Sequence, residues 1–113
     1  MHEMSLAEGV LQIIEDSAKS NAFTRVKTIW LEVGQLAGVE TEALRFCFDA
    51  VTRDTLAQGA QLEIIETAGA GWCLSCNQAV MVAARYEPCP LCDGYPVEIT
   101  GGTEMRVKEL EVE

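Results

Sequence analysis

Residues 72–92 read WCLSCNQAVMVAARYEPCPLC and contain two Cys-x-x-Cys pairs, which decide how this part of the chain folds. The pairs are Cys73/Cys76 and Cys89/Cys92, and twelve residues separate them. Each pair directs two sulfurs at one point, and a short hairpin between the pairs brings the two points together. Four thiolates in a tetrahedron are a ligand set that suits structural Zn²⁺. The spacing therefore predicts a four-cysteine zinc ribbon whose metal has no open coordination position.

Other interpretations of the four cysteines stay open at this point. An iron–sulfur cluster also accepts four cysteine ligands, a thioredoxin-type motif needs only one pair, and two disulfides would suit a secreted protein. A nucleic-acid-binding ribbon is disfavoured because Arg85 is the only cation in residues 70–101, against Glu87, Asp93 and Glu98. About thirty residues cannot build an adequate core, so metal binding should supply much of the folding free energy there.

The residues that precede the ribbon predict an α/β arrangement. Apolar residues at helical spacing indicate helices, and branched residues at period two indicate strands. The expected elements are a helix over 5–20, a strand over 26–33, a helix over 41–57 and a strand over 61–67. Ser5 and Glu8 match a capping box at the start of the first helix. The strand–helix–strand unit should place its two strands parallel if they share a sheet.

Glycine-rich breaks delimit the ribbon at Ala68–Gly71 and at Gly101-Gly102. Residues 104–112 resemble a last strand, which would gain little alone and is expected to return to the first sheet. The sequence therefore predicts an α+β fold, with two helices packed on a small mixed three-stranded sheet and an inserted zinc-ribbon module with four cysteine ligands. The expected domains are an α/β domain of residues 1–69 plus 102–113 and a zinc-binding ribbon of residues 70–101.

The composition limits the classes of function. The chain has 113 residues, 49% of them hydrophobic, and its 18 acidic and 8 basic side chains give a net charge of −10. This charge argues against binding to nucleic acid and to anionic membranes, both of which attract Lys and Arg. The longest apolar run, Ala79–Ala84, is too short to span a bilayer, and no cation precedes Lys19 as a signal peptide would require. We therefore expect a cytoplasmic protein without membrane insertion.

The one histidine of the chain is His2, beside the amino terminus. Most terminal tripeptides have no role. Here, however, the α-amine of Met1, the backbone nitrogen of His2 and its imidazole can chelate one ion, and the Glu3 amide nitrogen can close a square of four nitrogens. Square-planar nitrogen donors suit Ni(II) or Cu(II) rather than Zn(II). The sequence therefore predicts a second metal site at the amino terminus, held by the helix that follows.

The sequence does not predict an enzyme. It lacks the phosphate-binding pattern G-x-x-x-x-G-K, and no second histidine is available to activate a nucleophile. Cys47 lies between Leu44 and Val51 on the apolar stripe of the second helix, which favours a small buried residue. The residues leave two classes of function open, a metal carrier and a zinc-stabilised adaptor that acts through protein–protein contacts.

The chain combines MHEMSL at its start, VKTIWLEVGQLAGVE over residues 26–40, the two cysteine pairs and the tail GGTEMRVKELEV. This combination, which covers essentially the whole chain, resembles the HypA/HybF family of hydrogenase maturation nickel metallochaperones. The resemblance implies nickel delivery during assembly of NiFe hydrogenase and, in some members, of urease. It also implies two partners, a HypB-type accessory GTPase and the hydrogenase large-subunit precursor. A second copy of the chain is a further candidate partner.

The resemblance also implies roles for individual residues. Ni(II) as transient cargo would be held by Met1, His2 and Glu3, with Glu40 as a candidate auxiliary ligand. Structural Zn(II) would be held by Cys73, Cys76, Cys89 and Cys92. Glu40 is expected to be solvated unless the fold brings it near His2. Some relatives carry histidines after their cysteine pairs, whereas Asn77 and Asp93 stand there in this chain, so an exchange of cysteine for histidine at zinc is not available.

Overall fold

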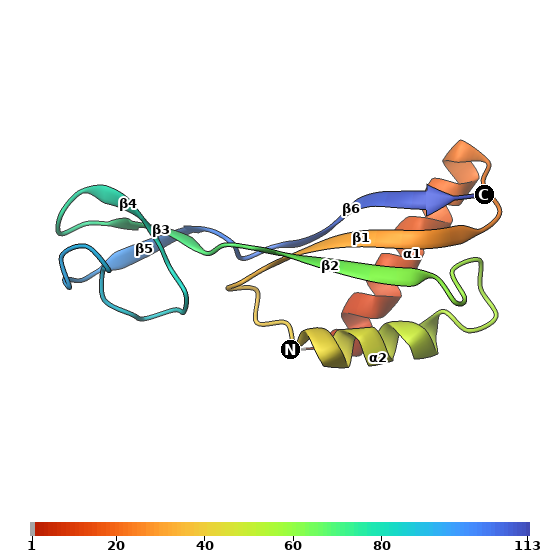
Figure 1. The fold of residues 1–113 in the computed structure, drawn as a ribbon, viewed down its shortest axis with the longest axis horizontal. Helices are drawn as coiled ribbons and strands as arrows, with labels where there is room; N and C mark the ends of the chain where they lie inside the picture. Colours follow the sequence, from red (N-terminus) through yellow and green to blue (C-terminus); the bar gives the residue numbers. More distant parts are fainter. Residues whose placement is uncertain (1) are drawn as a thin grey trace. The chain divides into compact units, whose positions relative to one another are not determined.

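The structure is a computed structural model that describes residues 2–113. The described residues form two helices and six strands (Figure 1). In chain order these are α1 (Glu3–Asn21), β1 (Val26–Gly34), α2 (Thr41–Val51), β2 (Gln61–Thr67), β3 (Ala70–Cys73), β4 (Gln78–Met81), β5 (Val97–Gly101) and β6 (Met105–Val112). The predicted α+β fold class is confirmed. No helix in this part of the chain is both long and apolar enough to cross a membrane.

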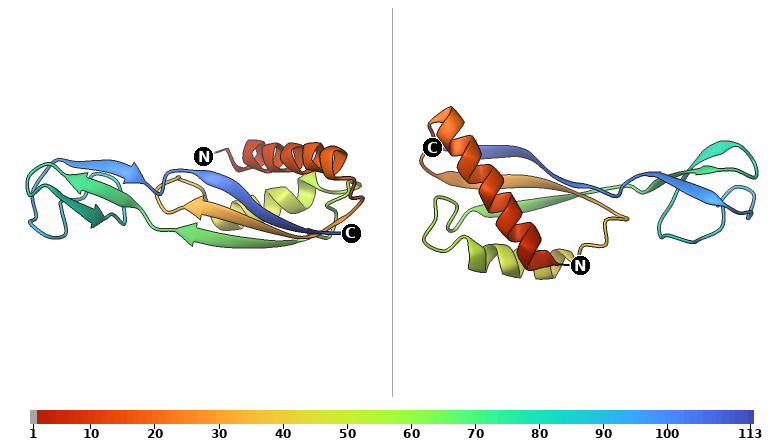
Figure 2. Two further views of the ribbon diagram at one scale, coloured as in Figure 1. Left: turned by 90° about the horizontal axis from the view of Figure 1, so that it is seen from above. Right: turned by 180° about the vertical axis from the view of Figure 1, so that it is seen from behind.

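The first sheet has three strands in the order β2-β1-β6. Figure 2 shows β1 and β2 pointing the same way and β6 pointing the opposite way. The backbone hydrogen bonds agree, because Gln35 N–H donates to the Thr67 carbonyl at 2.8 Å where β1 and β2 both end. At the other end, Thr24 N–H donates to the Glu113 carbonyl at 3.0 Å. The mixed sheet and the return of the last strand are therefore as predicted.

The apolar stripes of the two helices and the alternating side chains of β1 form the core of this part of the fold. The buried residues that make it up are Ala7, Val10, Ile14, Val26, Ile29, Leu31, Leu44, Phe48 and Leu62. The helix α1 crosses one face of the sheet and packs against α2 (Figure 2). From Ile29 to Val33, β1 buries every second residue most deeply, as expected of a strand that alternates its side chains between two faces. Val26 and Thr28 are buried out of this phase.

The start of α1 differs from the prediction. The helix begins at Glu3, not Ser5, and His2 is its N-cap residue without a side-chain capping hydrogen bond. The Leu6 N–H donates to the His2 carbonyl at 3.0 Å, which is the first intrahelical bond. The capping-box role predicted for Ser5 is therefore wrong, because Ser5 already lies within the first turn. The consequence is that His2 directly adjoins a regular helix.

The end of α2 also differs from the prediction, since the helix stops at Val51 and not near residue 57. The Thr52 hydroxyl donates to the Phe48 carbonyl at 2.8 Å, and Asp54 has a left-handed φ of 61°. The Thr52 N–H donates to the same carbonyl at 3.0 Å, and a hydroxyl that shares a carbonyl with the helical N–H bends a helix and slightly destabilises it. Turns therefore lead from Thr52 to β2.

The cysteines belong to a second three-stranded sheet, in the order β4-β3-β5. The strand β3 pairs antiparallel with β4, from Ala70 opposite Met81 to Cys73 opposite Gln78. It also pairs antiparallel with β5, where Cys73 lies opposite Val97. A strand in the spacer between the cysteine pairs was expected and is present as β4, but the hairpin that it forms with β3 turns at the first cysteine pair and not between the pairs. The strand β5 was not expected.

The chain divides into two compact units. The helical unit consists of the residues up to Leu31 together with Val39–Ile64 and Val107–Glu113, and the cysteine unit consists of Glu32–Gly38 and Ile65–Arg106. The domain boundaries expected from the sequence stay a prediction. What the structure adds is that residues 32–38 are part of the cysteine unit.

Candidate metal centres

The four paired cysteines converge on one point. Their Sγ atoms all lie within 4.8 Å of one another, the only such group of metal-ligating side chains among residues 2–113. The Sγ–Sγ distances are 3.6 Å for Cys73 and Cys92 and 3.8 Å for Cys76 and Cys89. Zinc–sulfur bonds of about 2.3 Å place the sulfurs of a tetrahedron about 3.8 Å apart. The cluster therefore has the spacing that a tetrahedral zinc ion requires.

Each cysteine pair is held by a tight turn that ends in a left-handed residue. Asn77 N–H donates to the Cys73 carbonyl, and Asp93 N–H donates to the Cys89 carbonyl, both at 2.8 Å. Asn77 has a φ of 55° and Asp93 a φ of 60°. Asparagine and aspartate tolerate this conformation better than other residues with a side chain. Asn77 and Asp93, noted in the sequence only for not being histidines, therefore shape the two turns.

Backbone N–H groups point at the sulfurs and help to fix their ionisation. The Cys76 N–H lies 3.4 Å from Cys73 Sγ, and it lowers the pKa of the Cys73 thiol to about 7. Burial and the neighbouring thiols raise the pKa of Cys76 to about 12. For Cys92 the Gly94 N–H favours the thiolate, but burial and the Cys73 thiol outweigh it and raise its pKa. Since a metal binds the thiolate, the hydrogen bond from the Cys76 N–H favours the form of Cys73 that binds a metal.

An apolar core surrounds the sulfurs. Cys73 and Cys89 are buried together with Val80, Val82 and Leu36. Leu36 comes from the loop after β1, and its N–H donates to the Gly102 carbonyl at 2.7 Å. Sequence reasoning assigned Leu36 only to a connecting loop. The one signal was a leucine in an otherwise small and polar stretch, and it did not indicate which residues Leu36 would contact.

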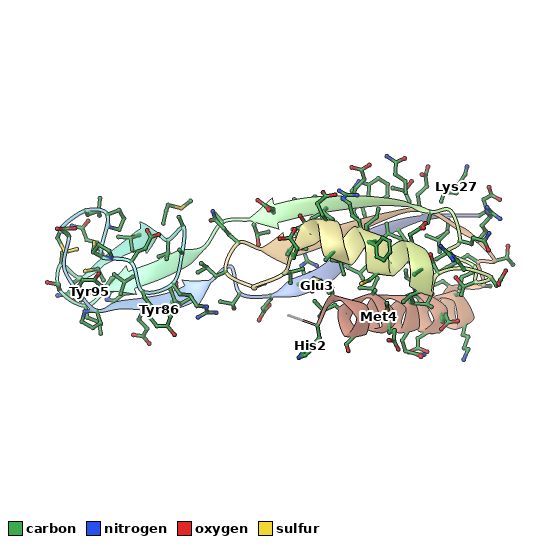
Figure 3. The ribbon with its side chains drawn as sticks, turned by 90° about the horizontal axis from the view of Figure 1, so that it is seen from below. His2, Glu3, Met4, Lys27, Tyr86 and Tyr95 are labelled. Carbon is green, nitrogen blue, oxygen red and sulfur yellow. The ribbon has the colours of Figure 1, made fainter. Side chains whose placement is uncertain are left out.

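At the amino terminus, His2 is exposed and Glu3 is turned toward α2 (Figure 3). One Glu3 carboxylate oxygen accepts a hydrogen bond of 3.3 Å from the Glu40 N–H. Glu40 is the N-cap of α2, and its carboxylate accepts from the Glu42 N–H at 3.4 Å. The structure therefore brings Glu3 and Glu40 together, but among the described residues no group of metal-ligating side chains joins them to His2. The remaining predicted nickel ligand, Met1, lies outside the described residues.

Cys47 was expected to be a buried residue of α2, and it is half-buried in the structure. It lies on a different unit from the four paired cysteines. It therefore takes no part in the metal cluster.

Comparisons with known proteins find a matching family and similar chains over the full length of the sequence. A family model described as "Hydrogenase/urease nickel incorporation, metallochaperone, hypA" matches residues 1–112. Proteins named hydrogenase maturation factor HypA, from Albidiferax ferrireducens and Azotobacter chroococcum, are 63% and 58% identical to this chain, and each match covers 100% of both chains. The solution structure of the Ni metallochaperone HypA from Helicobacter pylori matches with a TM-score of 0.72 at 25% identity, over 99% of this chain and 97% of that one.

Proposed function

Because the chain belongs to the HypA family of hydrogenase/urease nickel-incorporation metallochaperones, we propose that it binds Ni(II) at its amino terminus and delivers it during maturation of NiFe hydrogenase, or of urease. The observation that carries this proposal is the place of His2 as the N-cap residue of α1. The chelate would comprise the Met1 α-amine, the His2 imidazole and the backbone nitrogens of His2 and Glu3. Four nitrogen donors in one plane suit Ni(II).

The start of α1 supports this ligand set. The first backbone N–H groups of a helix have no intrahelical acceptor. The first intrahelical bond uses the His2 carbonyl, so the backbone nitrogens of His2 and Glu3 carry no helical hydrogen bond that the metal must break. The helix can therefore stay intact while the nickel ion is loaded and released.

The two nearby carboxylates would assist the chelate without completing it. The Glu3 and Glu40 side chains both hydrogen-bond backbone N–H groups at the start of α2. Their negative charge lies on the same unit as His2 and would favour a cation at this end of α1, since opposite charges attract. We assign them as auxiliary groups, with Glu3 contributing its backbone nitrogen to the square.

The cysteine cluster would hold the second metal, a structural Zn(II). Its four sulfurs have tetrahedral spacing, and four protein ligands leave zinc no position for a substrate. We therefore assign no catalytic step to this chain. In this scheme, nucleotide hydrolysis belongs to a HypB-type GTPase partner, and the hydrogenase large-subunit precursor accepts the nickel. We place these events in the cytoplasm.

The function is tested by nickel titration of His2→Ala in protein with an unmodified amino terminus. We expect one equivalent of Ni(II), with a defined absorption band, in the wild type and in a Ser5→Ala control. His2→Ala should lose the band while its zinc content stays unchanged. Tight, stoichiometric nickel binding by His2→Ala would contradict the proposed site. A wild-type protein without a defined band at one equivalent would instead favour a zinc-stabilised adaptor that carries no nickel.

A further inference from the structure

The four cysteines of the cluster differ in how far they are exposed to solvent. Cys73 and Cys89 are 0% and 1% exposed. Cys76 is half-buried, whereas Cys92 is exposed. A thiol that coordinates a metal is already a thiolate, and the reactivity of a thiolate toward solutes follows its exposure. Cys92 is therefore the residue of the cluster at which a small reactive solute meets a thiolate most readily.

Gly94 leaves space beside the Cys92 sulfur. A Cβ atom at Gly94 would lie 3.2 Å from Cys92 Sγ and 3.0 Å from Ser75 Oγ, which is tighter than an ordinary van der Waals contact. Gly94 does not have the positive φ of Gly38 or Gly102, so a left-handed backbone is not the reason for glycine at this position. What the absent side chain provides is room next to the exposed thiolate.

The exposed sulfur of Cys92 is in contact with a buried sulfur of the other cysteine pair. Its partner is Cys73 Sγ, at 3.6 Å, and Cys76 Sγ has the corresponding contact with Cys89 Sγ at 3.8 Å. Both contacts run between the two Cys-x-x-Cys pairs. A cysteine sulfenic acid condenses with a thiol that lies next to it and forms a disulfide. Cys73 is therefore placed to react with Cys92 once Cys92 is oxidised.

We propose that Cys92 is a site of oxidation by hydrogen peroxide and that Cys73 then closes a disulfide with it. The Cys92 thiolate attacks one peroxide oxygen, the O–O bond breaks, and the leaving hydroxide takes up a proton and becomes water. The Cys73 thiolate next attacks the sulfur of the Cys92 sulfenic acid, the S–O bond breaks, and a second hydroxide leaves and becomes water. The two sulfurs together lose two electrons, which reduce the peroxide.

The disulfide would make the cysteine unit unable to hold its metal. This inference rests on the part of the proposed function that assigns Zn(II) to the cluster. A structural zinc site needs four ligands, and the disulfide would leave two thiolates. The apolar core around the sulfurs is small, so the stability of this unit depends on the metal. The nitrogen ligands proposed for nickel include no thiol, so the disulfide would leave them chemically intact.

The test treats the full-length, zinc-loaded chain with hydrogen peroxide and follows zinc release with a coloured chelator. We expect loss of all bound zinc, and peptide mapping by mass spectrometry should find the first disulfide between Cys73 and Cys92. Reduction with dithiothreitol in the presence of Zn(II) should restore the zinc content. Met81 is 69% exposed and serves as an internal control for the oxidant. Zinc that stays bound while Met81 becomes a sulfoxide, or a first disulfide within one Cys-x-x-Cys pair, would overturn the proposal.

Substitutions of single glycines test the route to the sulfur. Gly94→Ala should slow zinc release by about twofold or more, because the reactivity of a thiolate follows its exposure. Gly101→Ala is the control in the same unit, since its Cβ would make only an ordinary contact of 3.5 Å with Ala70, and it should react like the wild type. Cys47→Ser removes the thiol outside the cluster and should also react like the wild type. Release from zinc-loaded Gly94→Ala at the wild-type rate would overturn the assignment of Cys92.

Metal analysis before the peroxide is added separates this proposal from the proposed function. An untreated wild-type chain that binds no zinc would remove both the zinc assignment and the oxidation site. An untreated chain that holds zinc and keeps it in peroxide would overturn the oxidation site alone. Nickel titration of the untreated chain tests the amino-terminal site independently of both outcomes.

Discussion

The Glu3 carboxylate accepts a hydrogen bond from the Glu40 N–H, and this contact joins the starts of α1 and α2. Both helices belong to the helical unit and pack against each other. The residue next to His2 is therefore fixed on two sides, by its own helix and by the start of the second one. This should strengthen metal binding by a chelate made of terminal nitrogens. Because Glu3 is already ordered, less conformational entropy is lost when the metal binds.

Glu3→Pro should abolish tight nickel binding. Proline is well tolerated at the first position of a helix, which Glu3 occupies in α1, so the fold should remain. The substitution removes the backbone N–H that would become the fourth nitrogen ligand. Glu3→Ala is the control, because it loses the carboxylate but keeps this N–H. In a nickel titration we expect one equivalent for Glu3→Ala and none for Glu3→Pro. Equal binding by the two variants would show that the Glu3 nitrogen is not a ligand.

Leu36→Ala should weaken zinc binding although Leu36 lies far from the cysteines in sequence. Its side chain is 6% exposed and packs in the core around Cys73 and Cys89. Truncation of a buried leucine costs about 2–5 kcal/mol. We expect much of this cost to destabilise the zinc-bound state relative to the zinc-free state, so that zinc binds more weakly. Leu44→Ala, in the helical unit, should lower stability but not zinc affinity. Competition with a chelator measures the difference, and the same zinc affinity in both variants would count against this coupling.

Substitution by alanine should change the stability of the protein in opposite directions at Gly34 and at Gly9. A Cβ at Gly34 would lie 2.2 Å from the Gly102 carbonyl oxygen, so Gly34→Ala should destabilise the protein by about 1–3 kcal/mol. A Cβ at Gly9, on an exposed position of α1, would meet nothing within 4 Å. Gly9→Ala should therefore stabilise by about 0.5–1 kcal/mol through helix propensity. Denaturant unfolding measures both, and a stable Gly34→Ala variant would rule out the close approach.

Asn77 should tolerate glycine better than alanine. Its φ of 55° is available to glycine at no steric cost, whereas alanine pays about 1–2 kcal/mol there. We expect Asn77→Ala to lower the thermal stability of the zinc-loaded protein and Asn77→Gly to leave it nearly unchanged. If both variants lost the same stability, the side chain of Asn77 rather than its backbone conformation would be the important feature.

Local patterns explain which features could be predicted from the sequence. The cysteine cluster follows from spacing, because each Cys-x-x-Cys turn fixes two sulfurs within a few residues of chain. The strands β1 and β2 follow from runs of branched side chains. Even here, boundaries failed where two local signals competed, as at Ser5, where a capping-box pattern lies inside the first turn of α1.

Non-local contacts explain what could not be predicted. Leu36 stands in a loop, and nothing near it in sequence indicates that it completes the core around cysteines more than thirty residues away. The contact of Glu3 with Glu40 depends in the same way on how α1 and α2 pack. Tyr86 carries no signal in the sequence because its left-handed backbone depends on the fold of the segment that contains it.

The central claim is that nickel binds to a free amino terminus beside His2. The most direct test compares the untagged wild type with a variant that carries one additional glycine before Met1, in a nickel titration followed by absorption spectroscopy. The addition leaves every side chain in place but moves the α-amine out of the chelate. We predict one equivalent of Ni(II) with a square-planar band for the wild type and no such band for the extended chain, with zinc content equal in both. An extended chain that binds nickel as tightly and with the same spectrum would contradict the account.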